Sequence, residues 1–212
     1  MKKFIGIYDY TVILTYLSLC SSVAGISLAF SGHSFFALIC LMLSGLLDMF
    51  DGKVARMKKR SQKEINYGIQ IDSLADIIAF GVLPICIGFS LGIESWYYLP
   101  ICIAFSLGAL IRLAYFNVNE EEVAKTREGR STSFIGLPTT SVALILPLVY
   151  MFKNITGSYF QYIYAFALLI IAVLFVLNVS FVRKPTNKKM IWLIVIGVLE
   201  VALIIGIKAW LR

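Results

Sequence analysis

The chain has 212 residues, of which 59% are hydrophobic, and its mean hydropathy is +0.86. Soluble domains are about 45–50% apolar, so this composition excludes an ordinary soluble domain and predicts an integral membrane protein. The net charge of +7 comes from 19 Lys and Arg residues against 12 Asp and Glu residues. With no soluble domain to carry that charge, a nucleic-acid partner is disfavoured, and a surface facing anionic lipid is favoured.

Hydrophobic stretches recur along the whole chain. A helix needs roughly 20 apolar residues to cross the hydrocarbon core. The pattern therefore predicts an all-α, polytopic transmembrane helical bundle with about six to eight spans. Because little else remains, we expect residues 1–212 to form a single transmembrane domain. The seven stretches lie near 11–32, 34–50, 68–92, 96–117, 139–153, 160–182 and 190–211.

The basic residues are distributed unevenly between the two sides of these spans. If the amino terminus is cytoplasmic, sixteen of the Lys and Arg residues fall on the inner side. Only Lys153, Lys208 and Arg212 then lie outside. The positive-inside rule favours this orientation. We therefore expect a multi-pass protein of the cytoplasmic membrane with its amino terminus in the cytoplasm.

Four aspartates lie at the adjoining ends of the second and third hydrophobic stretches. Ionisable groups inside a membrane cost several kcal/mol unless something compensates them, so they indicate a functional site. Asp48 and Asp51 are three residues apart and share one helix face. Asp72 and Asp76, four residues apart, share another. In antiparallel neighbouring spans, these carboxylates would converge near the inner, cytoplasmic face.

The chemistry of this acidic cluster indicates a metal. Neighbouring carboxylates cannot all stay ionised without cations. Hard divalent ions prefer oxygen ligands, so Mg²⁺ or Mn²⁺ fits. A bridging carboxylate would suit two ions about 3.5–4 Å apart. We therefore predict a site for two ions, with the ligands Asp48, Asp51, Asp72 and Asp76.

Small residues and an arginine flank the acids. Gly52, Ala55 and Gly68 would let a bulky ligand approach the helix backbone. Arg56 could hold a phosphate through its bidentate fork. For any single residue, the alternative is a buried salt bridge or a packing glycine. The complete spaced set favours a metal site that receives a phosphate-bearing ligand.

Written as a pattern, residues 48–76 read D-x-x-D-G-x-x-A-R, eleven residues, then G-x-x-x-D-x-x-x-D. This resembles the signature of the CDP-alcohol phosphotransferase family, membrane enzymes that displace CMP from a CDP-linked lipid with an alcohol. The segment between the half-signatures is longer than usual, and its extra residues fall in a predicted basic loop, 57–67. The resemblance implies a homodimer, a catalytic base at Asp76, and CDP binding by Gly52, Ala55, Arg56 and Gly68.

Three further stretches resemble the branch of the family that uses L-serine: D-S-L-A-D-I-I-A-F-G-V-L-P, R-L-A-Y-F-N and F-I-G-L-P-T. They imply transfer of a phosphatidyl group from CDP-diacylglycerol to L-serine. Arg112 is the candidate partner of the serine carboxylate, with Asn117 and the turn 134–139 as pocket walls. In the alternative interpretation, Arg112 extends to lipid headgroups. Tyr115 and Thr140 depart from the branch pattern.

Two other functions remain open at this level. The same chemistry could act on another alcohol, such as glycerol phosphate or inositol phosphate. Alternatively, intramembrane acids also mark the pathways of ion or metal transporters. Transporter sites usually lie near the bilayer midplane between repeated halves. The clustering of the acids at one surface, without an evident internal repeat, disfavours transport.

Overall fold

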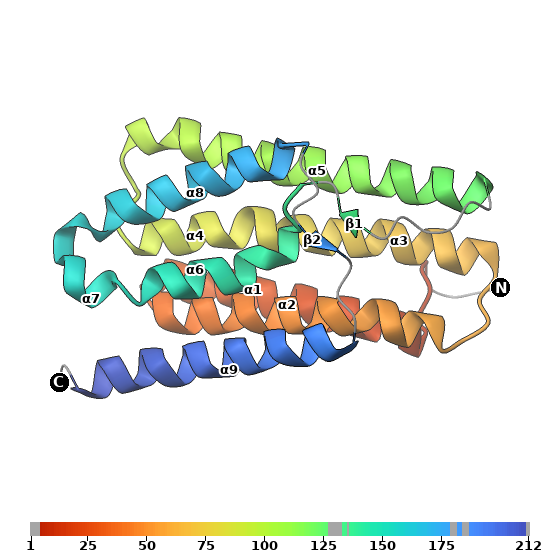
Figure 1. Ribbon diagram of the computed structural model, residues 1–212, viewed down its shortest axis with the longest axis horizontal. Helices are drawn as coiled ribbons and strands as arrows, with labels where there is room; N and C mark the ends of the chain where they lie inside the picture. Colours follow the sequence, from red (N-terminus) through yellow and green to blue (C-terminus); the bar gives the residue numbers. More distant parts are fainter. Residues whose placement is uncertain (1–4, 127–132, 135, 179–181, 184–186, 211–212) are drawn as a thin grey trace.

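A computed structural model describes residues 5–126, 133–134, 136–178, 182–183 and 187–210. Its long helices lie side by side along one common direction (Figure 1). The first half contains α1 (Tyr10–Phe30), α2 (Ser34–Arg56), α3 (Gln62–Asp76), the π-helix η1 (Ile77–Val82), α4 (Leu83–Ser90), η2 (Trp96–Tyr98) and α5 (Leu99–Thr126). The second half contains η3 (Thr139–Ser141), α6 (Val142–Tyr150), α7 (Lys153–Thr156), η4 (Gly157–Tyr159), α8 (Phe160–Val176) and α9 (Asn187–Trp210).

The only β-structure in the described ranges is one short antiparallel pairing of two loops. It joins β1 (Ser133–Phe134) to β2 (Val182–Arg183), with Phe134 opposite Val182. Five of the described helical segments are long and apolar enough to cross a membrane: Tyr10–Phe30, Ser34–Ala55, Gln62–Ser90, Trp96–Asn119 and Lys153–Val176. Two shorter apolar helices, Thr139–Tyr150 and Trp192–Gly206, fall within the remaining predicted stretches. The prediction of an all-α, multi-pass membrane bundle is confirmed.

The hairpin between the second and third spans differs from its predicted form. α2 continues beyond the apolar stretch near 34–50 to Arg56, where the predicted loop begins, but α3 begins at Gln62 rather than at residue 68. The predicted loop 57–67 was therefore too long, because its second half is helical. Ser61 and Glu64 form a capping box, in which the Ser61 amide donates to Glu64 Oε2 at 2.7 Å. This cap starts α3 inside a polar stretch that hydropathy alone assigns to a loop.

Small and hydroxyl-bearing residues join α1 to α2. The hydroxyls of Ser22 and Ser44 lie 3.0 Å apart, and Ser18 Oγ donates to the Ser44 carbonyl at 3.3 Å. A Cβ added at Gly25 would lie 2.9 Å from the Cys40 Cβ. Such contacts hold membrane helices together, because lipid is as apolar as the helices and burial alone gives little attraction. These contacts hold α1 against α2, the helix that carries Asp48 and Asp51.

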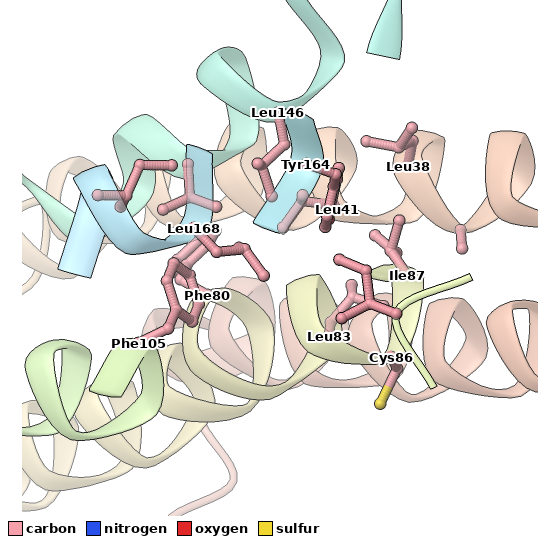
Figure 2. Close-up of a cluster of buried hydrophobic side chains, with 14 of the residues drawn as sticks. Leu38, Leu41, Phe80, Leu83, Cys86, Ile87, Phe105, Leu146, Tyr164 and Leu168 are labelled. Atoms are coloured by element: carbon pink, nitrogen blue, oxygen red, sulfur yellow. The ribbon is translucent and has the colours of Figure 1, made fainter. Parts of the chain in front are cut away.

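The apolar core lies among the third span and the helices around it (Figure 2). Phe80 and Leu83 are fully buried, and Phe105 from α5 and Leu146 from α6 are buried with them. Tyr164 on α8 is equally buried, and its hydroxyl donates to the Pro84 carbonyl at 2.9 Å. The core therefore holds the third span centrally.

A π-helix follows Asp76 directly. Leu83 donates its amide to the Ile78 carbonyl, five residues earlier. Pro84 has no N–H, so it cannot close an α-helical bond to Phe80, and the wider turn precedes it. Gly81 lies in this segment, and its carbonyl accepts from Ser106 Oγ on α5 at 3.2 Å. The π-helix thus brings α5 close to the span that carries Asp72 and Asp76.

Candidate active site

Three of the four aspartates meet between α2 and α3. One carboxylate oxygen each from Asp48, Asp72 and Asp76 lies within 4.8 Å of the others. Asp76 is buried, and the other two are partly buried. The carboxyl groups of Asp48 and Asp76 lie close enough to interact directly. The spacing of one helical turn within α3 therefore presents both of its acids to Asp48 across the hairpin.

Asp51 lies beside this cluster rather than within it. Its side chain is buried, with 8% exposed, and it accepts a hydrogen bond from Thr15 Oγ1 at 3.3 Å. It also neighbours the Asp72 carboxyl group closely enough for the two side chains to interact. Thr15 belongs to α1, so the site draws on three helices. The sequence gives little sign of this contact. Its only signal is a hydroxyl-bearing residue on the face of the first span that meets α2.

The donor set suits a hard divalent cation. Three carboxylates lie close enough together to bind a single metal ion. Like charges at this separation are stabilised by a cation between them. Oxygen ligands of this kind are preferred by Mg²⁺ and Mn²⁺ rather than by thiophilic metals. Asp51 could contribute to the same site through its contact with Asp72. The residues present therefore fit the predicted metal chemistry.

Arg112 faces the acids from α5. Its side chain is only 8% exposed, and Nη1 donates to Thr139 Oγ1 at 3.2 Å. The guanidinium lies 5.4 Å from the centroid of the Phe116 ring. It is close enough to Asp76 and Asp48 to interact electrostatically with both. This buried position differs from that of an arginine extended to lipid headgroups.

Asn117 on α5 forms a hydrogen bond with α3, at a residue between the two aspartates of α3. Its Nδ2 donates to Ser73 Oγ at 2.8 Å. Ser73 directly follows Asp72, and this contact was not anticipated from the sequence. In the predicted turn 134–139, residue 135 lies outside the described residues, whereas Thr139 is buried and touches Arg112. Tyr115 is half exposed.

The candidate CDP-binding residues lie on the same helix faces as the aspartates, closer to the α2–α3 hairpin. Gly52 and Ala55 follow Asp48 on α2 at intervals of one helical turn, and Gly68 precedes Asp72 by one turn. A Cβ added at Gly68 would lie 3.1 Å from Arg60 Nη1, so this cation lies over the glycine. Arg60 was not among the predicted site residues. Arg56 ends α2, and its side-chain position lies outside what the structure describes.

The hairpin loop is tied to the segment before α1. The Lys58 ammonium pairs with Asp9 and also lies 3.7 Å from Glu64 Oε1. The hydrogen bond to Asp9 raises the pKa of Lys58, because it favours the charged ammonium. Nearby, Tyr16 Oη donates to the Ile7 carbonyl at 3.0 Å. These contacts close the bundle end at which Gly68 and Arg60 lie.

Comparison with known proteins assigns the family. The family model for CDP-alcohol phosphatidyltransferase matches residues 11–178, most of the chain. The protein belongs to this family. Its members generally depend on divalent metal ions, and the three-carboxylate cluster is compatible with that dependence.

Several curated proteins are similar to this chain. CDP-diacylglycerol–serine O-phosphatidyltransferase of Saccharomyces cerevisiae is 35% identical over 129 residues, which cover 57% of this chain and 46% of that protein. The protein of the same name from Helicobacter pylori strain 26695 is 34% identical over 170 residues, covering 74% and 64%. Archaetidylserine synthase of Methanothermobacter thermautotrophicus is 30% identical over 185 residues, covering 86% and 72%. The chain thus spans about half to two thirds of the first two relatives.

Proposed function

We propose that this protein transfers a phosphatidyl group from CDP-diacylglycerol to L-serine and releases CMP. The observation that carries the proposal is the meeting of Asp48, Asp72 and Asp76 within one signature of a family that handles CDP-linked alcohols. The names of the similar yeast and bacterial proteins support serine as the acceptor. The archaeal relative, a synthase named for a serine lipid, agrees with that acceptor.

In the proposed reaction, the serine hydroxyl attacks the lipid-side phosphorus of the diphosphate. A new P–O bond forms to serine, the P–O bond to CMP breaks, and CMP leaves. A hydroxyl is a poor nucleophile near neutral pH, so its proton needs a positioned acceptor. Asp76 is the proposed acceptor, since it is the most deeply placed acid of α3 and faces Arg112. Divalent ions bound by the aspartates would neutralise charge on the phosphates.

The proposed metal ligands are Asp48, Asp51, Asp72 and Asp76, holding Mg²⁺ or Mn²⁺, with two ions as the expected number. Gly52, Ala55, Arg56 and Gly68 are the proposed CDP contacts. Arg60 adds a guanidinium next to Gly68 that could reach the diphosphate. In this arrangement, the nucleotide lies toward the hairpin and the reacting phosphorus lies at the acids.

Enlarging the small residues of α2 tests the position of the nucleotide. Gly52→Leu and Ala55→Leu should each raise the CDP-lipid concentration for half-maximal rate by roughly tenfold, because the added side chain overlaps the ligand. Steady-state kinetics with varied CDP-diacylglycerol would measure the change. Gly206→Leu is the matched control, since nothing lies within 4 Å of a Cβ added there. Unchanged dependence in both α2 variants would place the nucleotide on another face.

The proposed serine pocket lies between α5 and the acids. The Arg112 guanidinium would bind the serine carboxylate, because it is buried and close enough to Asp76 to interact with it. Thr139 would fix the guanidinium through the hydrogen bond to Nη1. Asn117 would shape the wall through its bond to Ser73.

Replacing the Arg112 guanidinium by another group tests this pocket. Arg112→Lys keeps a positive charge but loses bidentate geometry, so the serine concentration for half-maximal rate should rise by about tenfold. The CDP-lipid dependence should stay near the wild-type value and serves as the internal control. Arg112→Ala should raise the serine requirement further. An unaltered serine requirement in both variants would remove Arg112 from the pocket.

The assignment itself is tested by the release of CMP. The purified protein would be incubated with CDP-diacylglycerol, Mn²⁺ or Mg²⁺, and one acceptor at a time: L-serine, glycerol 3-phosphate or inositol phosphate. We expect CMP and phosphatidylserine only with L-serine. CMP release with another acceptor would keep the chemistry and change the substrate. No CMP with any alcohol, together with metal uptake into sealed vesicles, would favour the transporter alternative.

The wider setting of the reaction is part of the same proposal. Residues 1–212 would act as one catalytic domain in the cytoplasmic membrane, with the acids at the cytoplasmic face. The distribution of basic residues in the sequence supports that orientation. We also expect a homodimer, which crosslinking in native membranes would detect. Accessibility of engineered cysteines in loop 57–61 to a membrane-impermeant reagent would fix the orientation.

A further inference from the structure

A cavity with several polar side chains in its lining lies at the end of the bundle opposite the aspartates. Its volume is about 240 Å³, and it is bounded by the α1–α2 turn, the start of α2, the α6–α7 connection and one residue of α9, Ile204. α2 begins there at Ser34 and reaches Asp48 fourteen residues later, about 21 Å along the helix axis. Figure 1 shows α7 and the start of α2 at the end away from the α2–α3 hairpin. The cavity is therefore separate from the proposed reaction site.

The polar side chains around this cavity provide hydrogen-bond donors and one basic side chain, that of Lys153. Lys153 is partly buried, and its Nζ donates to Ser34 Oγ at 3.4 Å. The Tyr150 hydroxyl lies 3.3 Å from the same oxygen. His33 and Asn154 complete the polar lining, which contains no aspartate or glutamate.

The positive charge of Lys153 is balanced by no acid within the described side chains. The salt bridges among them involve Lys58 alone, at the other end of the molecule. Lys153 instead lies 5.3 Å from the centroid of the Tyr150 ring and contacts a neutral hydroxyl. A cation withdrawn from water without an anion favours the binding of one.

The start of α2 adds to this potential. The first residues of α2 line the cavity, and His33 makes no side-chain cap to this helix of 23 residues, so its positive end lies at the cavity. A lysine at the end of an apolar span often extends outward to the membrane surface. Lys153 turns inward instead, over Tyr150 and onto Ser34. The inward cation, the two hydroxyls and the partly open cavity together favour a small anion.

We propose that this cavity binds a phosphate group, with the Lys153 ammonium as its counter-ion and Ser34 and Tyr150 as hydroxyl partners. Lys153 begins an apolar helix long enough to span the membrane, so the cavity lies at the level of lipid headgroups. The phosphate could belong to an anionic lipid or be free in solution. The site is independent of phosphatidyl transfer, because none of its lining residues belongs to the acidic cluster.

Binding measurements on the purified full chain test the site. Inorganic phosphate and short-chain phosphatidic acid serve as separate probes, with phosphatidylcholine as the neutral lipid and chelator present to keep metal from the aspartates. Native mass spectrometry measures retained lipid, and thermal unfolding at constant ionic strength measures phosphate binding. Lys153→Gln should weaken binding by roughly tenfold, the usual scale for losing one charged hydrogen-bond partner. Tyr150→Phe, which keeps the ring beneath Lys153, should weaken it less.

Lys59→Gln is the matched control, because it removes the same charge from an exposed position at the other end. It should bind like the wild type, and circular dichroism and gel filtration would establish that each variant is folded. Lysine-dependent binding of phosphatidic acid alone identifies a lipid headgroup, and binding of phosphate alone identifies a free anion. Equal binding by wild type, Lys153→Gln and Tyr150→Phe, or no binding of either probe by the wild type, would overturn the proposal.

Discussion

Asp76→Asn is expected to reduce phosphatidyl transfer by about 10²–10⁴-fold, the range that a positioned general base supplies. Asparagine has nearly the same size, but it cannot accept the proton of the attacking hydroxyl. Asp76 is buried between Asp48 and Arg112, so no exposed acid can replace it easily. The measurement is the rate of CMP release at saturating serine, CDP-lipid and metal.

The dependence of the rate on metal concentration distinguishes a catalytic base from a residue that acts only as a metal ligand. If Asp76 is the base, its variant stays slow even when the metal site is saturated, whereas Asp48→Asn recovers part of its rate as metal is added. Glu94→Gln, an exposed change at the opposite end of the third span, controls for the loss of one carboxylate. A folded Asp76→Asn enzyme with the wild-type rate at saturating metal would require another base.

Asp51→Asn is expected to lower activity by orders of magnitude while the protein remains folded. The substitution keeps the side-chain size and leaves Thr15 a carbonyl acceptor, so packing at the α1 contact should survive. It removes a negative charge next to Asp72, and the Mn²⁺ or Mg²⁺ concentration for half-maximal rate should rise.

Thr15→Val distinguishes the charge of Asp51 from its position. This variant preserves the carboxylate but removes the hydrogen bond from Thr15 Oγ1, so its loss of activity should be much smaller. Metal titrations of turnover on both variants give the comparison. Near-normal turnover of folded Asp51→Asn in Mg²⁺ or Mn²⁺ would remove Asp51 from the metal site.

The helical fold and the meeting of three acids followed from local patterns. Long apolar stretches predict spans because lipid leaves helices as the simplest way to satisfy backbone polar groups. The intervals of three and four residues predict shared faces, and Asp48, Asp72 and Asp76 do converge. The separate position of Asp51 could not be predicted, because it depends on Thr15 and therefore on how α1 packs.

Helix boundaries near the site were predicted less well than its residues. Hydropathy alone marks only residues 34–50 of the second span, since the last turns of α2 are polar, and the acid spacing and the basic loop extended it to Arg56. The start of α3 was readable from Ser61 and Glu64, whose spacing is that of a capping box. The Arg112–Thr139 contact joins residues from α5 and η3. It depends on tertiary packing that no local pattern encodes.

The π-helix after Asp76 sets the rotational phase between the two halves of the third span. One extra residue in a helical turn rotates everything beyond it by about 100°. The acids before η1 can thus face α2 while Phe80 and Leu83, in and just after it, face the core. A single-residue deletion within 77–82 that restored a regular α-helix would force one of these faces out of register. For this span, residue count is a stricter constraint than hydrophobicity: apolar substitutions leave the phase intact, whereas insertions and deletions do not.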